Sequence, residues 1–312
     1  MATIERAVII QRPSSRKEAE LDSDVYHLPT LDNAFSITHV YTPPDLRKRG
    51  YATKMMSLLH EKLRPRFQGT LLEGPNVAHH EIATTGILSF LYSGVGEFYS
   101  KCGSPGWHIQ TSTETYWNTA SVIEEDVDHF RNFSQTLITE QDFVDIGRKD
   151  ADLLREYLEA RSRQGLMPHQ FAVLPTGDEF AWLVARSKFY GKILSDKPLP
   201  DYWGVRVVDD STNPTENFAI WFFDYVKKEL HFLRIRCRDA DVFKVITRAA
   251  AIAAKAQGCE RILAWNVDEG LLSACPQNNR VTQPRTKNLA AVAWYGKGDC
   301  PEWAMNEKYG WC

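Results

Sequence analysis

The clearest chemistry in the sequence lies in one short basic turn, Arg47-Lys48-Arg49-Gly50-Tyr51-Ala52. A strand-like stretch precedes this turn and a helix-like pattern follows it. Its backbone N–H groups should therefore face outward at a helix N-terminus, where the helix dipole favours an anion. Gly50 and Ala52 are small where a phosphate would approach the main chain. A solvated surface loop is the alternative, but the position between strand and helix favours a phosphate site.

A second candidate, Tyr99, lies downstream in a short segment, Gly94–Lys101, that we expect to be helical and closed by Gly103. A tyrosine hydroxyl keeps its proton at neutral pH and can deliver it to a departing anion at short range. The alternative role is an aromatic ring packed between helix and sheet with an incidental hydroxyl. The combination with the basic turn favours a role in catalysis.

These residues need a strand, a tight turn, a helix and a further strand to position them. β-Branched and aromatic residues predict a strand over 34–42 that ends at Pro43-Pro44, and a change of period predicts a helix from Thr53 to about Pro65. An apolar run predicts another strand over 87–92. The second half repeats this order without repeating the turn sequence. Its predicted elements are strands at 203–208, 217–225 and 230–237, a helix at 242–257 and a strand at 261–266.

Length and composition bound the fold and the partners. A chain of 312 residues with 43% hydrophobic and 25% charged residues suits two globular domains, which we place at residues 1–120 and 121–312. The 37 basic residues do not outnumber the 40 acidic ones, so a nucleic-acid partner is not expected. No apolar run has the length of a membrane span, and the N-terminus lacks the pattern of a signal peptide. We therefore expect a cytoplasmic protein with no membrane partner.

Cysteine and histidine spacing gives no sign of a metal centre. The six cysteines include no C-x-x-C pair, so we interpret them as free thiols in a reducing compartment. His79-His80-Glu81 has no third ligand at a defined spacing, and we interpret it as a solvated loop. We expect no metal cofactor.

The turn and its surroundings resemble the GNAT N-acetyltransferase superfamily, in which a strand is followed by R/Q-x-x-G-x-G/A and a helix. The matching residues are Thr42-x-Pro44-x-x-Arg47-x-x-Gly50-x-Ala52, and Phe98-Tyr99-x-Lys101-x-Gly103 matches a second motif of that superfamily. The resemblance implies a GNAT-like mixed α/β (α+β) sheet flanked by helices, with a second, degenerate GNAT-like domain at the C-terminus. It also implies acetyl-CoA as cosubstrate, with its pyrophosphate on the turn and its pantetheine arm beside Val40 and Thr42. Tyr99 would then protonate the leaving CoA thiolate.

Three longer segments are similar to the fungal lysine N6-acetyltransferase family: VYTPPDLRKRGYATKMM, LYSGVGEFY and NEKYGWC. This similarity implies acetyl transfer to the side-chain amine of free lysine. Family members carry a first strand and a pair of helices before the motif strand, whereas about forty residues precede it here. We therefore expect an N-terminally shortened first domain.

An amine acceptor requires a base, because only the neutral amine attacks a thioester. His39 on the expected motif strand and Glu73 on the next strand are candidates, although a strand histidine is more often structural. Some tandem-domain acetyltransferases place their terminal carboxylate in the active site, which makes Cys312 a third candidate. The sequence thus predicts an N-acetyltransferase acting on a small amine. The alternative is a catalytically inactive acyl-CoA-binding or scaffold protein. The sequence does not indicate an oligomeric state.

Overall fold

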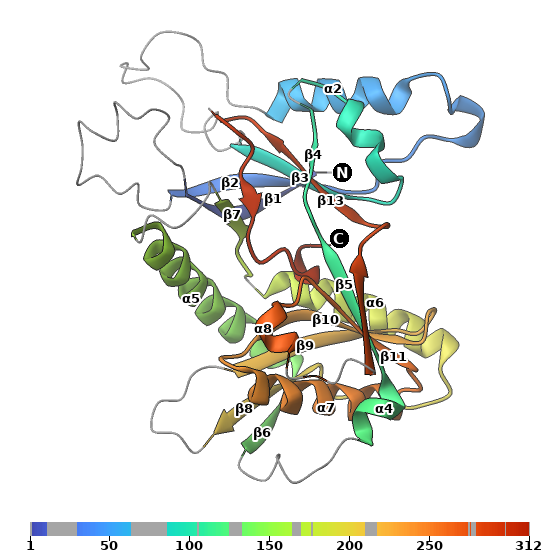
Figure 1. Cartoon of the computed structure of the whole chain (residues 1–312). Coiled ribbons are helices and arrows are strands. Elements are labelled where there is room, and N and C mark those ends of the chain that lie inside the picture. The colour runs from blue at the N-terminus through green and yellow to red at the C-terminus, as the bar shows by residue number, and fades with distance from the viewer. Residues whose placement is uncertain are drawn as a thin grey trace. The chain divides into compact units, whose positions relative to one another are not determined.

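The computed structural model of the chain describes residues 2–10, 30–63, 86–104, 106–124, 133–163, 170–175, 177–209, 217–273, 275, 279–296 and 298–311. The chain divides into two compact units, each with a seven-stranded sheet (Figure 1). Unit 1 comprises Met1–Thr111, Ala151–Leu174 and Arg285–Asn306, and unit 2 comprises Ser112–Asp150, Pro175–Pro284 and Glu307–Cys312. The sequence predicted two domains that follow one another along the chain, at 1–120 and 121–312. In the structure, each unit is instead assembled from three separate segments.

The sheet of unit 1 mixes parallel and antiparallel neighbours. Its strand order is β14 (Glu302–Trp303), β7 (Gln170–Val173), β1 (Ala2–Ile10), β2 (Thr30–Ile37), β3 (Leu88–Ser93), β13 (Leu289–Trp294) and β4 (His108–Ile109). β1 and β2 are antiparallel, and β2 and β3 are parallel. A parallel pair needs a crossover connection. The 3-10 helix η1 (Pro44–Leu46) and the helix α2 (Tyr51–Leu63) lie in this connection between β2 and β3.

The motif strand differs from its prediction at both ends. β2 begins at Thr30 and ends at Ile37, five residues before the predicted end at Thr42. Two residues later His39 has a φ of 55°, which is incompatible with an extended strand. The two prolines therefore do not end the strand, because the chain has already left the sheet before it reaches them.

α2 confirms the predicted helix. Its buried residues are Met56, His60 and Leu63, whereas the apolar side chains of Met55 and Leu58 remain 44% and 49% exposed. His60 is buried because its ring has polar and aromatic partners. Its Nδ1 lies 2.9 Å from the hydroxyl of Tyr295, and its ring lies beside Trp107. A buried polar group with a hydrogen-bond partner avoids the desolvation penalty that an unpaired one incurs.

The sheet of unit 2 has the order β12 (Arg280–Pro284), β5 (Thr113–Asn118), β11 (Arg261–Trp265), β10 (Glu229–Arg236), β9 (Asn217–Asp224), β8 (Gly204–Asp209) and β6 (Phe133–Ile138). β9 is buried along its whole length, as expected for a strand that is covered on both faces. The helices α6 (Asp178–Leu194) and α7 (Ala240–Ala256) both pack against β9 and lie on opposite sides of the sheet (Figure 1).

The remaining elements are the helices α4 (Thr119–Ile123), α5 (Phe143–Arg163) and α8 (Glu269–Leu272) and the 3-10 helices η2 (Gly96–Lys101), η4 (Glu140–Asp142) and η6 (Lys308–Gly310). The strands and the long helix predicted in the second half are confirmed to within a few residues. β5 was not predicted, because its sequence TETYWN resembles a polar linker. It becomes a strand by pairing with β11 on one side and β12 on the other. The predicted mixed α/β fold class is confirmed.

None of the helices in the described part of the chain combines the length and the apolar character needed to cross a bilayer.

Candidate active site

The strands β2 and β3 separate where the predicted motif begins. Their parallel ladder joins residues 34–36 to residues 88–90 and goes no further. β3 continues to Ser93 along its other edge, where it pairs with β13. Among the described residues, the edge of β3 at 91–93 that faced β2 has no strand partner. The backbone at 38–42 and this edge of β3 are therefore not joined by a strand ladder.

The basic turn leaves a row of backbone amides without protein acceptors. The first hydrogen bond of α2 runs from the Lys54 N–H to the Gly50 carbonyl, at 2.9 Å. For the amides of residues 48–53, no acceptor occurs among the described residues. No acidic residue lies in the first turn of α2. An open helix N-terminus with unpaired N–H groups and no carboxylate is a favourable site for an anion.

Gly50 is required by the shape of this turn. Its φ of 79° lies in the left-handed region that glycine adopts without strain, and Lys48 also has a positive φ of 63°. A Cβ at Gly50 would contact no protein atom within 4 Å. The constraint on this residue is therefore its backbone conformation and not contact with neighbouring protein atoms.

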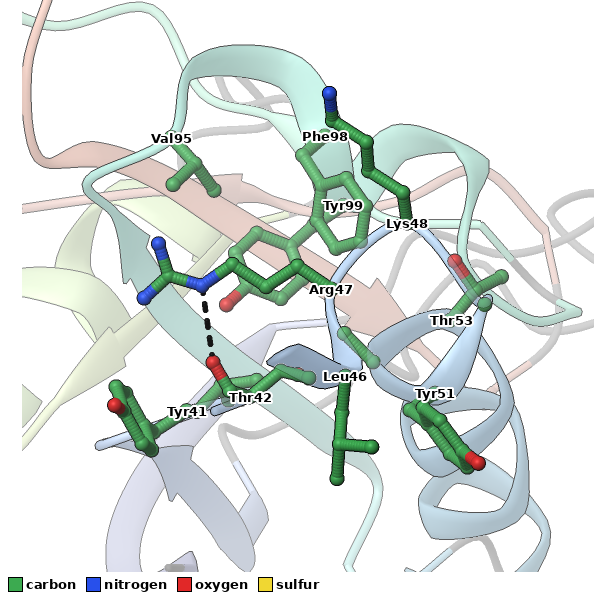
Figure 2. Close-up of a pocket in the computed structure, with 13 residues that line it drawn as sticks. Tyr41, Thr42, Leu46, Arg47, Lys48, Tyr51, Thr53, Val95, Phe98 and Tyr99 are labelled. Carbon is green, nitrogen blue, oxygen red and sulfur yellow. Dashed lines mark hydrogen bonds between the residues drawn. The ribbon is translucent and has the colours of Figure 1, made fainter. Parts of the chain in front are cut away.

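Arg47 is directed toward the loop that precedes the turn. Its Nε donates a hydrogen bond to the Thr42 carbonyl at 3.1 Å, and its guanidinium lies 5.9 Å from the centre of the Tyr41 ring (Figure 2). These contacts link the two ends of the segment that leads from β2 to α2. Arg47 thus fixes the loop as well as contributing positive charge.

A cavity of about 570 Å³ lies over this turn. Its lining combines the open amides with four partly exposed apolar or aromatic side chains: Tyr41 at 66%, Tyr51 at 53%, Val95 at 63% and Phe98 at 38% exposure. The other lining residues are Val40, Thr42, Leu46, Arg47, Lys48, Gly50, Ala52, Thr53 and Tyr99. The cavity suits a long ligand with an anionic group and a less polar arm. Of the residues predicted to bind the cofactor, only Arg49 is not part of this lining.

Tyr99 lies on η2 and its ring borders the same cavity (Figure 2). Its side chain is largely buried, and it packs edge to face with Trp107 and Phe98. Burial raises the pKa of Tyr99 above its ordinary value of 10.0, and the neighbouring Cys102 raises it further. The phenol is therefore neutral and able to donate a hydrogen bond or a proton at physiological pH.

The three candidate bases have different outcomes. His39 follows the end of β2, so the strand alternation that would direct it toward the site does not apply. Its side chain is exposed, lies 2.9 Å from the Thr38 hydroxyl and does not line the cavity. Glu73 and Cys312 lie outside the described residues. His79-His80-Glu81 also lies outside them.

Five of the lining residues were not predicted as site residues from the sequence: Tyr41, Leu46, Thr53, Val95 and Phe98. Their proximity in sequence to the predicted site residues could have identified them. Leu46 and Thr53 immediately flank the turn, and Val95 and Phe98 lie within one helical turn of Tyr99. A helix presents neighbouring residues of one face together, so residues adjacent to a candidate site residue are reasonable candidates themselves.

Unit 2 repeats the parallel strand, helix, strand order with a different helix start. β10 pairs in parallel with β11 over residues 229–231 and 261–263, and α7 connects them. Asp239 caps α7, because its carboxylate accepts hydrogen bonds from the amides of Asp241 and Val242. Beyond the parallel ladder, the Ile235 amide donates to Glu307 at 2.7 Å. The equivalents of the open groups in unit 1 are thus occupied by side chains of the protein.

Glu307 belongs to a buried charge cluster in unit 2. Arg234 donates two hydrogen bonds to Asp150, at 2.6 and 3.0 Å, and also pairs with Glu307. Burial would raise the pKa of Asp150, but Arg234 and Arg236 outweigh burial and lower it. For Glu307 burial is the larger influence, so its pKa is raised despite Arg234. The free cysteines of the described residues are Cys102, Cys237, Cys259, Cys275 and Cys300, and no cluster of three metal-ligating side chains occurs among the same residues.

A search of solved structures found several that are similar to this chain. A GCN5-related N-acetyltransferase from Kribbella flavida superposes with a TM-score of 0.51 at 10% identity, covering 94% of this chain and 56% of that one. A GCN5-related N-acetyltransferase from Anabaena variabilis ATCC 29413 gives a TM-score of 0.48 at 10% identity, with 85% and 56% covered. Eis1 from Mycobacterium abscessus gives 0.45 at 10% identity, with 94% and 61% covered. The chain thus spans a little over half the length of these structures, 56% of the first two.

The first of these likenesses shows a GNAT-like fold, in agreement with the fold that the sequence motif implied. No curated protein sequence matches the chain. Residues 120–312 match a family described as the LYC1 GNAT-like C-terminal domain. This match covers more than half of the 312 residues. The chain therefore belongs to the LYC1 GNAT-like C-terminal domain family.

Proposed function

We propose that this protein is an N-acetyltransferase that transfers the acetyl group of acetyl-CoA to a primary amine. The observation that carries the proposal is the row of unpaired amides at 48–53 beside a cavity of about 570 Å³. A diphosphate would accept hydrogen bonds from these amides and be stabilised by the helix dipole. Lys48, which lines the cavity, would add a cation to that site.

The divergence of β2 and β3 offers a path for the pantetheine arm. An arm with two amide groups can pair with backbone groups of residues 38–42, much as an added strand would. Val40 and Thr42 line the cavity on this side. Backbone N–H groups at the divergence would also polarise the thioester carbonyl, because they are fixed dipoles in a partly dehydrated site.

Tyr99 is the residue that we assign to the leaving group. When the amine attacks the thioester carbon, the C–S bond breaks and the CoA sulfur departs as a thiolate. Tyr99 would protonate that thiolate. Burial raises the pKa of Tyr99, so the phenol carries its proton at neutral pH and has one to donate. The amine attacks directly, so no acyl-enzyme forms.

Free lysine is the acceptor that we propose, by attack of its side-chain amine. The support is the similarity of three sequence segments to the fungal lysine N6-acetyltransferase family. Deprotonation of the ammonium group, directly or through water, requires a base that the described residues do not identify. His39 is exposed and Glu73 and Cys312 are outside the described residues.

The test is thiol release from acetyl-CoA by the purified full chain, with a panel of amines that contains lysine, ornithine, polyamines and a lysine peptide. We expect CoA release that depends on lysine, with N6-acetyllysine as the product. Release with polyamines or peptides but not lysine would overturn the acceptor and leave the acetyltransferase proposal standing. No release with any amine would overturn the activity.

One observation favours a second candidate function, a catalytically inactive acyl-CoA-binding protein. The cavity is lined by most of the residues that we propose for CoA binding, whereas the one described base candidate, His39, does not line it. Calorimetric titration separates the two functions. Tight CoA binding without turnover on any amine supports the second candidate, and turnover excludes it.

A further inference from the structure

The helix α6 of unit 2 has apolar residues on two opposite faces. One face is buried against the protein through Phe180, Leu183 and Val184. The other presents Trp182, Phe189 and Ile193, which are 49%, 61% and 63% exposed. Helices of soluble proteins are normally polar on the side away from their own core, and a helix that is apolar all round is normally buried on both sides.

The exposed residues form one continuous stripe. In addition to the three large side chains it contains two exposed alanines and two exposed charged residues. The full stripe is Asp178, Ala181, Trp182, Ala185, Phe189, Lys192 and Ile193. These positions follow the three- and four-residue spacing of one helix face. We call this set the α6 stripe.

The α6 stripe is complementary to itself in the antiparallel direction. Ala185 lies midway between Asp178 and Lys192, which are about 21 Å apart along a helix axis. A twofold axis through Ala185 would bring Asp178 of each copy to Lys192 of the other. The same operation would bring Trp182 beside Phe189. The small side chain at the centre would allow the two helices to approach closely.

The charges at the two ends of the stripe are available for such pairing. Among the described residues, neither Asp178 nor Lys192 has an ion-pair partner. The other cations of α6 are engaged within the chain. Arg186 stacks on Tyr190 and Trp311, and Lys188 pairs with Glu140. The stripe therefore has one acidic end, one basic end and an apolar centre.

We propose that the α6 stripe is a dimer interface that binds the α6 stripe of a second copy of this chain, antiparallel and centred on Ala185. A twofold interface is isologous, so each contact occurs twice and a surface must complement itself. The α6 stripe satisfies that requirement in two ways. Its acidic end would meet the basic end of the other copy, and its apolar residues would pack against the same residues of that copy.

Sedimentation velocity on the full chain across a wide concentration range tests the interface. We expect a reversible dimer for the unaltered protein. Phe189→Asp should give a monomer at every concentration, because it buries a charge in the apolar part of the contact. Ile252→Asp is the matched control, since Ile252 is 51% exposed on α7 of the same unit and should not affect dimerisation. Circular dichroism and thermal unfolding check that each variant is folded.

A charge exchange tests the antiparallel register. Asp178→Lys and Lys192→Asp should each weaken dimerisation by about tenfold, because each places like charges together twice. The double variant with both substitutions should regain most of the affinity, which only pairing between these two positions in different copies explains. A monomeric unaltered protein, or a Phe189→Asp variant that still dimerises, would overturn the interface. Failure of the double variant to recover would overturn the register.

Discussion

The two units contain the same local arrangement, a strand, a helix and a parallel strand. They differ in how the N-terminus of the helix is satisfied. In unit 1 the start of α2 has free amides, a glycine with a φ of 79° and no acidic residue in its first turn. In unit 2 the start of α7 is closed by the carboxylate of Asp239. The polar edge of β10 is likewise occupied by Glu307.

This difference shows two uses of a helix N-terminus: in one it contributes to the stability of the protein, and in the other it can bind a ligand. A helix N-terminus has unsatisfied donors that need an acceptor, which can be a side chain or a ligand. Unit 2 supplies the acceptors itself, which stabilises the unit and leaves little for a phosphate. Unit 1 leaves its donors open, as expected for a site that binds an anion. The following predictions test this comparison, from the largest expected effect to the smallest.

Gly50→Asp should weaken CoA binding by about a thousandfold, or ~4 kcal/mol, because it introduces a carboxylate where we place the diphosphate. Isothermal titration with CoA measures the effect. Gly298→Asp is a matched control, because Gly298 has a similar φ of 76° and equally open surroundings. Equal loss of binding in both variants would show that backbone strain and not charge at the turn is responsible.

Glu307→Ala should reduce the free energy of unfolding of the protein by about 3 kcal/mol, since it removes a buried partner of Arg234 and the acceptor of the Ile235 amide. Urea unfolding followed by tryptophan fluorescence measures it. Glu260→Ala, which removes an exposed ion pair with Lys228, should have almost no effect. An unchanged free energy of unfolding in Glu307→Ala would contradict the view that Glu307 stabilises unit 2.

Tyr99→Phe should lower kcat by about a hundredfold while the affinity for CoA stays unchanged, because only the proton donor is removed. Steady-state thiol release and calorimetry together measure this. Tyr51→Phe removes another hydroxyl from the lining of the same cavity and should leave kcat unaltered. A Tyr99→Phe enzyme with normal kcat would assign the protonation to water or another group.

Asp239→Ala should cost about 1 kcal/mol of stability through loss of the helix cap, without changing CoA binding. Asp241→Ala is the control, because Asp241 lies in the same first turn and does not cap the helix. Thermal unfolding of the two variants gives the difference. If the Asp239→Ala variant bound a second molecule of CoA, the carboxylate of Asp239 would be the group that excludes CoA from unit 2.

Local patterns in the sequence were sufficient for the turn, α2, β3 and most of the second half. The spacing around Gly50 and the change of period after it depend on residues within one or two helical turns. The same holds for Tyr99 on η2. The features that decide these elements, a left-handed glycine and an amphipathic face, are local properties of the chain.

Partners distant in sequence could not be predicted in this way. Arg234 and Asp150 are 84 residues apart, and Ile235 and Glu307 are 72 residues apart. β5 is a strand only because β11 and β12 flank it. His39 was misplaced for a related reason, since pattern alone did not show that β2 leaves its partner after residue 36. The buried role of His60 likewise depends on Tyr295.

The order of strands in the first sheet also matters for synthesis of the protein. β13 lies between β3 and β4 in that sheet, yet it follows all the strands of the second sheet along the chain. A ribosome must therefore translate every strand of unit 2 before unit 1 can acquire its β13. During that time the edges of β3 and β4 have no partner, and exposed strand edges favour aggregation. Nascent chains of this protein should depend on chaperones for longer than chains whose domains fold one after another.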